Sequence, residues 1–247
     1  NIDTKDFTWQ TSLNYSFNKN EIDKLYNDLE RVGNYFVGQS INVIYTKRFG
    51  GIWQSDEAEI AKIYNAEPGD YKIIDRNRNN IIDDDDRDFV GQTTPQFFGS
   101  FSNTFKSHGF DLTIFLTYAG GHKIYNPFAY LDSYSPSANM SPDYYHNYWT
   151  PERPSNKYPR LGSTNSQLYE TDGMYQKGDY IRLKNLELGY TLPRNIANKV
   201  YASNIRVYAS VQNLVTFTKY TGFDVETSNA NPYPACRVFM GGLTVNF

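Results

Sequence analysis

The sequence predicts an all-β protein built as a segment of about seven antiparallel strands of a transmembrane β-barrel with long extracellular loops. Three observations predict this fold. Aromatic residues make up 17% of the chain, with 22 Tyr and 16 Phe, and ring-bearing side chains favour strands. Apolar and polar residues alternate over stretches of about ten residues, the length of a tilted membrane-spanning strand. Short connections are combined with long polar ones, as in outer-membrane barrels.

The first strands are predicted from apolar residues at every second position. Residues Phe7–Phe17 alternate throughout, Ser40–Ile52 alternates more weakly, and Phe97–Lys106 has a ring at every fourth position. The residues that share one face of these strands are Phe7, Trp9, Leu13, Tyr15 and Phe17; Ile41, Val43 and Tyr45; and Phe97, Phe101 and Phe105.

The later strands follow the same rule, with one interruption. In Tyr180–Thr191 the apolar residues change parity, and a β-bulge near Lys184 and Asn185 would restore the faces because one extra residue shifts the alternation. The other predicted strands are Phe110–Tyr118, with Phe110, Leu112, Ile114, Leu116 and Tyr118 on one face; Asn204–Gln212, with Ile205, Val207, Ala209 and Val211; and Phe239–Phe247, with Phe239, Leu243, Val245 and Phe247.

The connections between the predicted strands fall into two classes. Ser107–Gly109 is a tight turn, and Pro193–Ser203 is short and contains one helical turn, whereas Gly51–Pro95 and Gly120–Gly178 are long and polar. Short turns at one end and long loops at the other are typical of outer-membrane barrels. Asn18–Gln39 is longer than a connection at the short-turn end should be, which counts against this plan.

Composition and motif content exclude several classes of function. The formal net charge is −3, so there is no electrostatic reason to expect a nucleic acid partner. No segment approaches the ~20 apolar residues of a membrane-spanning helix, and the single cysteine, Cys236, excludes a disulfide within the chain. No Gly-x-Ser-x-Gly, Walker or dinucleotide-binding glycine motif is present, and no enzymatic activity is predicted.

One loop has the spacing of an EF-hand-type calcium loop, with oxygen ligands at positions 1, 3, 5, 9 and 12 and a backbone carbonyl at position 7. Asn80 replaces the usual Gly at position 6, and Asn tolerates the left-handed backbone required there. Position 12 is Asp, shorter than the usual Glu. The alternative is a polar turn with solvated carboxylates. The predicted ligands of a structural Ca²⁺ are Asp75, Asn77, Asn79, Ile81 through its carbonyl, Asp83 and Asp86.

Two aromatic segments of the long connection Gly120–Gly178 are candidates for binding a sugar or a peptide. Tyr125–Tyr130 and Tyr144–Trp149 combine rings with polar side chains. Such surfaces bind sugars or peptides, but rings also pack a loop onto itself or onto a partner protein, and both interpretations are open. The three histidines, His108, His122 and His146, have no ligand spacing and are expected at the surface.

Several stretches, in order along the chain, are similar to one known family. Gly178–Pro193, read as GDYIRLKNLELGYTLP, and Gln212–Glu226, read as QNLVTFTKYTGFDVE, resemble late-strand motifs of SusC/RagA-type TonB-dependent outer-membrane transporters. The other stretches that carry the resemblance are Phe7–Ile22, Phe89–Leu112, the loop Tyr148–Leu161 and the C-terminal strand Pro232–Phe247.

The resemblance implies that residues 1–247 form the C-terminal portion of a larger barrel, without the plug and early strands of the family. It implies a place in the outer membrane and a part in active import of large nutrients, either oligosaccharides or oligopeptides. The implied partners are a SusD-like surface lipoprotein, the TonB complex acting through the plug, and the remaining barrel strands of the same protein. On the residues alone, the alternative is a soluble calcium-stabilised β-sandwich that binds glycans.

Overall fold

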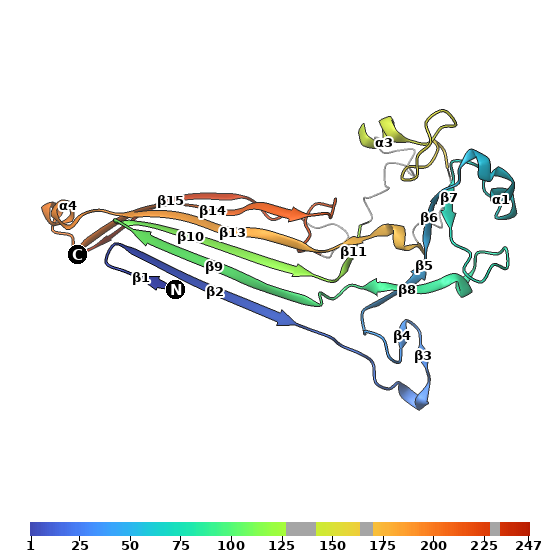
Figure 1. Ribbon diagram of the computed structural model, residues 1–247, viewed down its shortest axis with the longest axis horizontal. Coiled ribbons are helices and arrows are strands. Elements are labelled where there is room, and N and C mark those ends of the chain that lie inside the picture. The colour runs from blue at the N-terminus through green and yellow to red at the C-terminus, as the bar shows by residue number, and fades with distance from the viewer. Residues whose placement is uncertain (127–141, 164–169, 228–232) are drawn as a thin grey trace.

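One long antiparallel sheet organises the computed structural model (Figure 1). The structure describes residues 1–126, 142–163, 170–227 and 233–247. Neighbouring strands of the sheet follow one another in the order of the chain, so the sheet is an up-and-down meander. Its seven strands are β1 (Ile2–Asp3), β2 (Phe7–Phe17), β9 (Phe97–Ser107), β10 (Phe110–Gly120), β13 (Tyr180–Thr191), β14 (Asn204–Thr218) and β15 (Val238–Asn246).

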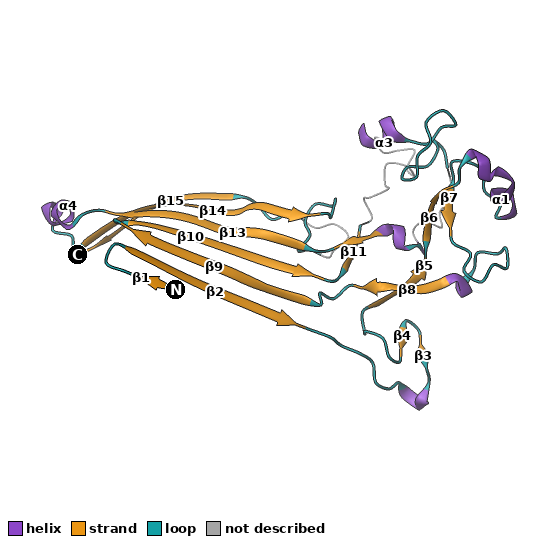
Figure 2. Cartoon of the chain, in the orientation of Figure 1, coloured by secondary structure: helices purple, strands orange, loops and turns teal. Residues whose placement is uncertain are grey.

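The remaining elements are short (Figure 2). Among the described residues, four two-stranded ladders lie outside the main sheet: β3 (Arg31–Val32) with β4 (Tyr35–Phe36), β5 (Val43–Lys47) with β8 (Arg87–Gln92), β6 (Phe49–Ile52) with β7 (Tyr71–Ile73), and β11 (Lys123–Tyr125) with β12 (Tyr175–Lys177). The α-helices of the described residues are α1 (Ala58–Ile63), α3 (Pro142–Asn147) and α4 (Arg194–Ala197). None of these helices has the length and hydrophobicity needed to cross a bilayer.

Apart from Ser40–Ile52, the predicted strands of the main sheet are confirmed; β9, β10 and β14 run further than predicted, and β15 begins and ends one residue earlier. β14 continues to Thr218, beyond the predicted end at Gln212, because Asn213 adopts a positive φ of 52° and the ladder resumes after it. On β13 the predicted bulge is present, since Leu183 pairs with Leu116 and Asn185 pairs with Phe115, which leaves Lys184 between them. These irregularities keep the alternation of faces intact on both strands.

The prediction that Ser40–Ile52 forms a strand of this sheet was wrong. The segment is divided into β5 and β6, which pair with β8 and β7 in separate ladders. Ile44 and Lys47 point to opposite faces of β5 and both are buried, whereas a barrel strand has one face toward lipid. The seventh strand is instead β1, and residues 18–96 form one long connection. The length of Asn18–Gln39 therefore no longer conflicts with the plan.

The strand register separates apolar from polar side chains. One row across β2, β9, β10, β13 and β14 runs through Leu13, Phe101, Leu116, Leu183 and Val215. A row of the opposite parity runs through Gln10, Thr104, Thr113, Glu187 and Ser210. We call these two sides of the sheet the apolar face and the polar face. The apolar side chains are freely accessible, with Leu13 65% and Phe217 64% exposed, which suits contact with lipid.

One amide lies on the apolar face and is satisfied there. Asn103 is 8% exposed, and its Oδ1 accepts hydrogen bonds from Trp9 Nε1 at 2.9 Å and from the Thr11 hydroxyl. In a hydrocarbon environment a polar side chain without such partners would cost several kcal/mol. The pairing therefore makes the amide compatible with a lipid-facing surface.

The two ends of the sheet differ in their connections (Figure 1). At one end, His108 and Gly109 form a two-residue turn with φ of 49° and 85°, the left-handed pair that a tight hairpin requires. The connection from β13 to β14 at this end contains α4 and one further 3₁₀ turn. At the other end, residues 18–96, 121–179 and 219–237 connect the strands and carry all four small ladders.

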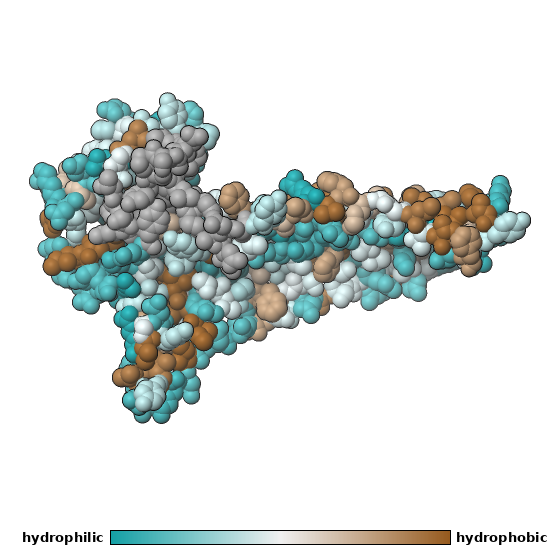
Figure 3. All heavy atoms as spheres, turned by 180° about the vertical axis from the view of Figure 1, so that it is seen from behind, coloured by the Kyte–Doolittle hydropathy of each residue, from teal (hydrophilic) through white to brown (hydrophobic). Residues whose placement is uncertain are grey.

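The long connections fold together into a lobe with a core of its own. Ile52 on β6, Tyr71 on β7, Trp149 and Met174 form one buried cluster. The Trp149 indole also donates a hydrogen bond of 3.0 Å to Gln54 Oε1. Segments far apart in the chain are thereby packed into one body. Figure 3 shows hydrophobic side chains over the branch that carries β3 and β4 and toward the α4 end of the sheet.

The facing of β10 gives a first prediction. Ile114 lies at mid-strand on the apolar face between Asn103 and Leu186, whereas Thr113 lies on the polar face opposite Glu187. Ile114→Arg should destabilise the inserted barrel by about 2–4 kcal/mol, because it places a charge in hydrocarbon. Thr113→Arg should be tolerated, since the new guanidinium faces a carboxylate.

The measurement is the amount of folded, heat-modifiable protein in the membrane fraction, compared between the two variants of the complete protein at equal synthesis. Equal yields of the two variants would show that the apolar and polar faces have been assigned wrongly.

Candidate functional site

The polar face carries two groups of charged side chains, one toward each end of the sheet. In a barrel this face borders the interior, so its charges shape the surface that a solute meets. Both groups are centred on an arginine, Arg206 on β14 and Arg182 on β13.

The Arg206 cluster joins three neighbouring strands near the short turns. The Arg206 guanidinium donates to Asp111 Oδ1 on β10 at 3.0 Å and to Glu187 Oε1 on β13 at 2.7 Å. Gly189, between these strands, has no side chain, and a Cβ there would lie 2.3 Å from the guanidinium. Glycine at this position therefore gives Arg206 the space to reach across β13 to Asp111.

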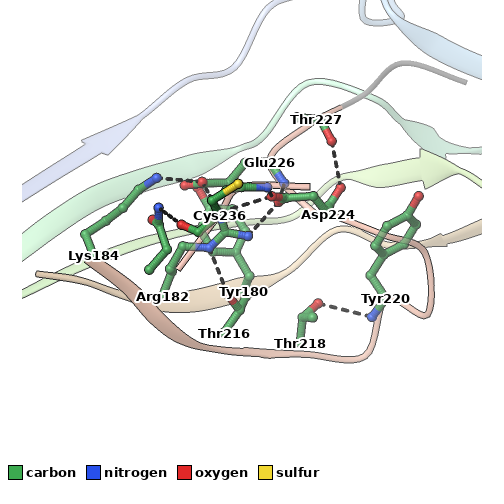
Figure 4. Close-up of polar contacts among 12 residues, drawn as sticks. Tyr180, Arg182, Lys184, Thr216, Thr218, Tyr220, Asp224, Glu226, Thr227 and Cys236 are labelled. Atoms are coloured by element: carbon green, nitrogen blue, oxygen red, sulfur yellow. Dashed lines mark hydrogen bonds and ion pairs between the residues drawn. The ribbon is translucent and has the colours of Figure 1, made fainter. Parts of the chain in front are cut away.

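The Arg182 cluster lies near the opposite end and is more deeply buried (Figure 4). The side chains of Arg182 and Asp224 are 5% and 3% exposed. The Arg182 guanidinium donates to Asp224 Oδ1 at 2.6 Å, to Glu226 Oε2 at 2.5 Å and to the Thr216 hydroxyl at 2.8 Å. Lys184 Nζ lies 2.7 Å from the same Glu226 oxygen. Buried charges are tolerated only with such complete pairing.

Asp224 connects this cluster to the last long connection, residues 219–237. Its carboxylate accepts backbone N–H hydrogen bonds from Glu226 at 3.0 Å and from Ala235 at 2.9 Å. Burial alone would raise the pKa of Asp224, but the hydrogen bonds from Arg182, Ala235 and Glu226 outweigh it and hold that pKa below its usual value. The carboxylate therefore stays charged at neutral pH, and the connection is held against the polar face.

The predicted calcium loop folds as a single compact turn in the lobe. Asp75 Oδ2 accepts the N–H of Asn80 at 2.8 Å, and Asn80 has the expected left-handed backbone, with a φ of 64°. Asp86, which is 1% exposed, accepts the N–H of Arg76 at 2.7 Å. The first and last predicted ligands are thus brought to the two ends of one closed loop.

The intermediate ligands follow the same turn. The side-chain oxygen of Asn77 accepts the N–H of Asn79 at 3.0 Å, that of Asn79 accepts the N–H of Ile81 at 2.8 Å, and Asp83 Oδ1 accepts the N–H of Asp85 at 2.9 Å. Within the described residues, no group of three or more His, Cys, Asp or Glu side chains is arranged to hold a metal ion. Three of the six predicted ligands are not carboxylates: the side-chain oxygens of Asn77 and Asn79 and the backbone carbonyl of Ile81. Oxygen ligands of this kind suit Ca²⁺.

Among the other binding candidates that the structure describes, Tyr145 is 60% exposed, whereas several of the remaining rings pack within the lobe. Tyr144 and Trp149 are 1% and 6% exposed, and the Tyr144 ring packs edge-on against Tyr158 with centroids 5.4 Å apart. Tyr125 packs against Tyr175 in the β11–β12 ladder. These rings support the interpretation of loop packing, whereas residues 127–130 of the first aromatic group lie outside the described part.

The expectation for the histidines was wrong at His122. This side chain is buried, and a Cβ at Gly178 would lie 2.3 Å from its Nε2, so the ring occupies the space left by that glycine. Burial lowers the pKa of His122, and the nearby Asp179 offsets this only in part. The imidazole is therefore a neutral packing group of the lobe.

Sequence reasoning missed both arginine clusters. The Arg206 cluster takes one charged residue from each of three strands, whereas the Arg182 cluster joins two residues of β13 to two acids that follow β14. No motif connects these positions in the chain. A signal was present, since Asp111, Glu187 and Arg206 all occupy the polar parity of their strands, and Asp111 and Arg206 are the single charged residues of β10 and β14. Opposite charges on neighbouring strands could have been paired once the register was known.

Comparison with known proteins places the whole chain beside one group. It is 31% identical to the TonB-dependent receptor P3 of Formosa agariphila over all of the chain and 27% of that receptor. It is 28% identical to the TonB-dependent receptor SusC of Bacteroides thetaiotaomicron, over all of the chain and 25% of SusC. The chain thus spans about a quarter of the length of these relatives. No family model matches the chain.

Solved structures show the same fold. The RagAB peptide transporter superposes with a TM-score of 0.80 at 24% identity, and the match covers 100% of this chain and 28% of that one. The RagAB peptide importer in its open-open state gives a TM-score of 0.78 over 99% of this chain. The predicted fold, a segment of a large β-barrel, is therefore confirmed.

The Arg182 cluster gives a second prediction. Arg182→Met leaves Asp224 buried without its cation, so the segment 219–237 should detach from the polar face. Hydrogen exchange at the Glu226 and Ala235 amides, which donate to Asp224, should accelerate by ~10-fold or more, as expected for a loss of at least about 1.4 kcal/mol. Lys184→Met, which removes the more exposed cation, is the matched control and should change these rates much less. Unchanged exchange in Arg182→Met would show that other contacts hold the segment.

Proposed function

Because the chain belongs to the TonB-dependent receptors of the SusC/RagA type, we propose that it forms part of an outer-membrane active importer of large nutrients. The observation that carries the proposal is the division of one sheet into an apolar and a polar face. A wall with lipid on one side and a wet interior on the other needs this division.

The orientation in the membrane follows from the two ends of the sheet. Outer-membrane barrels have short turns on the periplasmic side and long loops outside the cell. We therefore place the His108–Gly109 turn and α4 in the periplasm, and the lobe, which the described residues of the three long connections form, outside.

The sheet is open, which supports a larger barrel completed by other strands of the same protein. In the described part of the chain, β1 and β15 are the edges of the sheet. An edge within a bilayer leaves backbone N–H and C=O groups without partners, and such edges are not tolerated there. We propose that strands of the remaining protein pair with both edges, and that the plug of that protein couples the barrel to the TonB complex.

The polar face suits large polar nutrients. Its positions on β2, β9, β10 and β13 carry hydroxyl, amide and carboxylate groups, among them Gln10, Thr104, Thr113 and Glu187. Such groups form hydrogen bonds with sugar hydroxyls and with peptide groups alike. The similar RagAB structures are described as a peptide importer, and we propose an oligopeptide or an oligosaccharide as the nutrient. The role is binding and passage, without catalysis.

The outer lobe supports a protein partner. Large apolar side chains that are exposed in this chain lie on the branch around β3 and β4, namely Tyr26, Leu29, Val32, Tyr35 and Ile41. An apolar patch on an extracellular loop marks a protein contact. We propose that a SusD-like surface lipoprotein closes over the lobe.

The alternative of a soluble, glycan-binding β-sandwich is not supported. A sandwich buries the apolar face of one sheet against a second sheet. In the part of the chain that the structure describes, the other ladders have two strands each, and the apolar face of the main sheet is uncovered.

The complete protein provides the third prediction. It should fractionate with the outer membrane, require detergent for extraction and migrate heat-modifiably on a gel, because a closed barrel resists unfolding until it is boiled. Cells that lack the protein should lose uptake of a labelled oligopeptide or oligosaccharide pool, and loss of TonB should have the same effect. Recovery of the protein in a salt-washed soluble extract would contradict the proposal.

We further propose that the loop Asp75–Asp86 binds Ca²⁺ and stiffens the lobe. The closed turn, the left-handed Asn80 and the buried carboxylate of Asp86 support this proposal. The Tyr64 hydroxyl donates to Asp75, and the pKa of Tyr64 is raised by burial, by this hydrogen bond and by the charges of Asp75 and Asp86. Negative charge is therefore concentrated where the cation would bind.

Calcium removal is the fourth prediction. The complete protein should bind Ca²⁺ by isothermal titration, and a chelator should increase protease cleavage within residues 75–86. Asp75→Asn keeps an oxygen that can accept the backbone hydrogen bonds but removes a ligand charge, and should weaken binding ~10-fold or more. Asp84→Asn, in the same acidic run but outside the predicted ligand set, is the control. Cleavage that is independent of Ca²⁺ in the unmodified protein would refute the site.

A further inference from the structure

A groove of about 730 Å³ lies at the end of the sheet that bears the lobe, where β9, β10, β13 and β14 meet the long connections. Its apolar lining includes Phe97, Tyr118, Ile181 and Phe217. The charged residues along it are Lys177, the last residue of β12, and Asp179 and Lys219, which lie immediately beyond the ends of β13 and β14.

The strand register places this groove on the apolar face. Tyr118 pairs with Ile181, and Ile181 pairs with Phe217, so the three side chains form one row across β10, β13 and β14. This row lies on the same face of the sheet as Ile114, and Arg182 lies on the opposite face. Ile181 is half-exposed and Phe217 is more so. The groove therefore opens toward lipid, on the outside of the proposed barrel.

The charges along the groove are unbalanced toward positive. Lys177 stands directly opposite Lys123 in the β11–β12 ladder, and like charges in such a pair repel. Lys123 lies 4.0 Å from Asp172, whereas neither Lys177 nor Lys219 forms an ion pair with another residue in the described ranges. Asp179, the one acid in the lining, accepts the N–H of Gly121 at 2.8 Å and is held at the strand end.

We propose that this groove binds an anionic lipid whose headgroup bears a phosphate, in preference to a lipid with no net charge. The argument rests on the proposed membrane orientation, which puts the strand ends at the level of the lipid headgroups on the outer side. An acyl chain would lie along Ile181 and Phe217, and the phosphate would be held by Lys177 and Lys219. Rings at this level anchor the boundary of the bilayer, and lysines near the surface attract anionic lipids.

A free phosphate ion fits the observations less well. It would use the lysines but leave the row of Tyr118, Ile181 and Phe217 without an apolar partner. A neutral lipid would use the row and leave two ammonium groups unpaired. An anionic phospholipid provides both an acyl chain for the apolar row and a net negative charge for the two lysines.

The test uses the complete receptor in nanodiscs of phosphatidylcholine that contain a minor fraction of phosphatidylglycerol, and counts retained phosphatidylglycerol by native mass spectrometry. The double variant Lys177→Gln/Lys219→Gln should lower retention ~30-fold, as expected for two lysine charges at a membrane surface. Asp179→Asn should increase retention, because it removes the one opposing charge of the lining. Lys106→Gln, on the polar face, is the control and should have no effect.

The outcomes distinguish a lipid from a free phosphate ion, and failure of the lipid proposal from failure of the proposed function. The amount of bound phosphatidylglycerol should not fall when millimolar inorganic phosphate is added. Displacement of the lipid by phosphate would show that the groove is a phosphate site that does not recognise the acyl chain, and would overturn the lipid proposal. Unchanged retention in the double variant would overturn the lipid proposal while leaving the importer intact, provided that the variant still migrates heat-modifiably. A receptor that does not enter the membrane at all would instead refute the proposed function.

Discussion

Every backbone N–H and C=O group that meets hydrocarbon must be hydrogen-bonded within the protein, because no water is present to replace the missing partner. The main sheet satisfies this requirement between its strands by continuous antiparallel ladders, from β2 to β15. The apolar face, the single amide that is paired on it and the open edges all follow from this constraint. So does the placement of the connections at the two ends of the sheet, where water is available, whereas within the strands the backbone departs from regular pairing at Lys184 and Asn213 and the ladders resume beyond them.

The same constraint explains where the charges lie. Arg182 and Arg206 need partners on neighbouring strands, and only the polar face can hold such groups without contact with lipid. The two clusters serve different elements. Arg206 connects three strands to one another, whereas Arg182 connects two strands to the final long connection. The first maintains the shape of the wall, and the second determines which segment covers the interior surface next to it.

The strands and their facing could be predicted because alternation is local, and Phe7–Phe17 and Tyr180–Thr191 were predicted to the residue. The end of β14 was missed because Asn213 breaks the parity. Ser40–Ile52 was misassigned because a strand buried on both faces in the lobe also has a short apolar alternation. The arginine clusters depend on register between strands that are distant in sequence, and no local pattern contains that information. The turn around Asn80 was foreseen because its spacing is contained in one segment.

The order of the strands has a consequence for how the chain folds. β9 and β10 are joined by two residues, so pairing them closes the smallest loop of the sheet, whereas pairing β2 with β9 must close residues 18–96. The entropy lost on closing a loop grows with its length, and contacts distant in sequence form more slowly. The β9–β10 hairpin is thus the natural nucleus, and β2 joins late. Until β2 pairs with it, the edge of β9 that faces away from β10 has no partner strand. The time for which this edge stays unpaired therefore depends on how fast the residues between β2 and β9 fold.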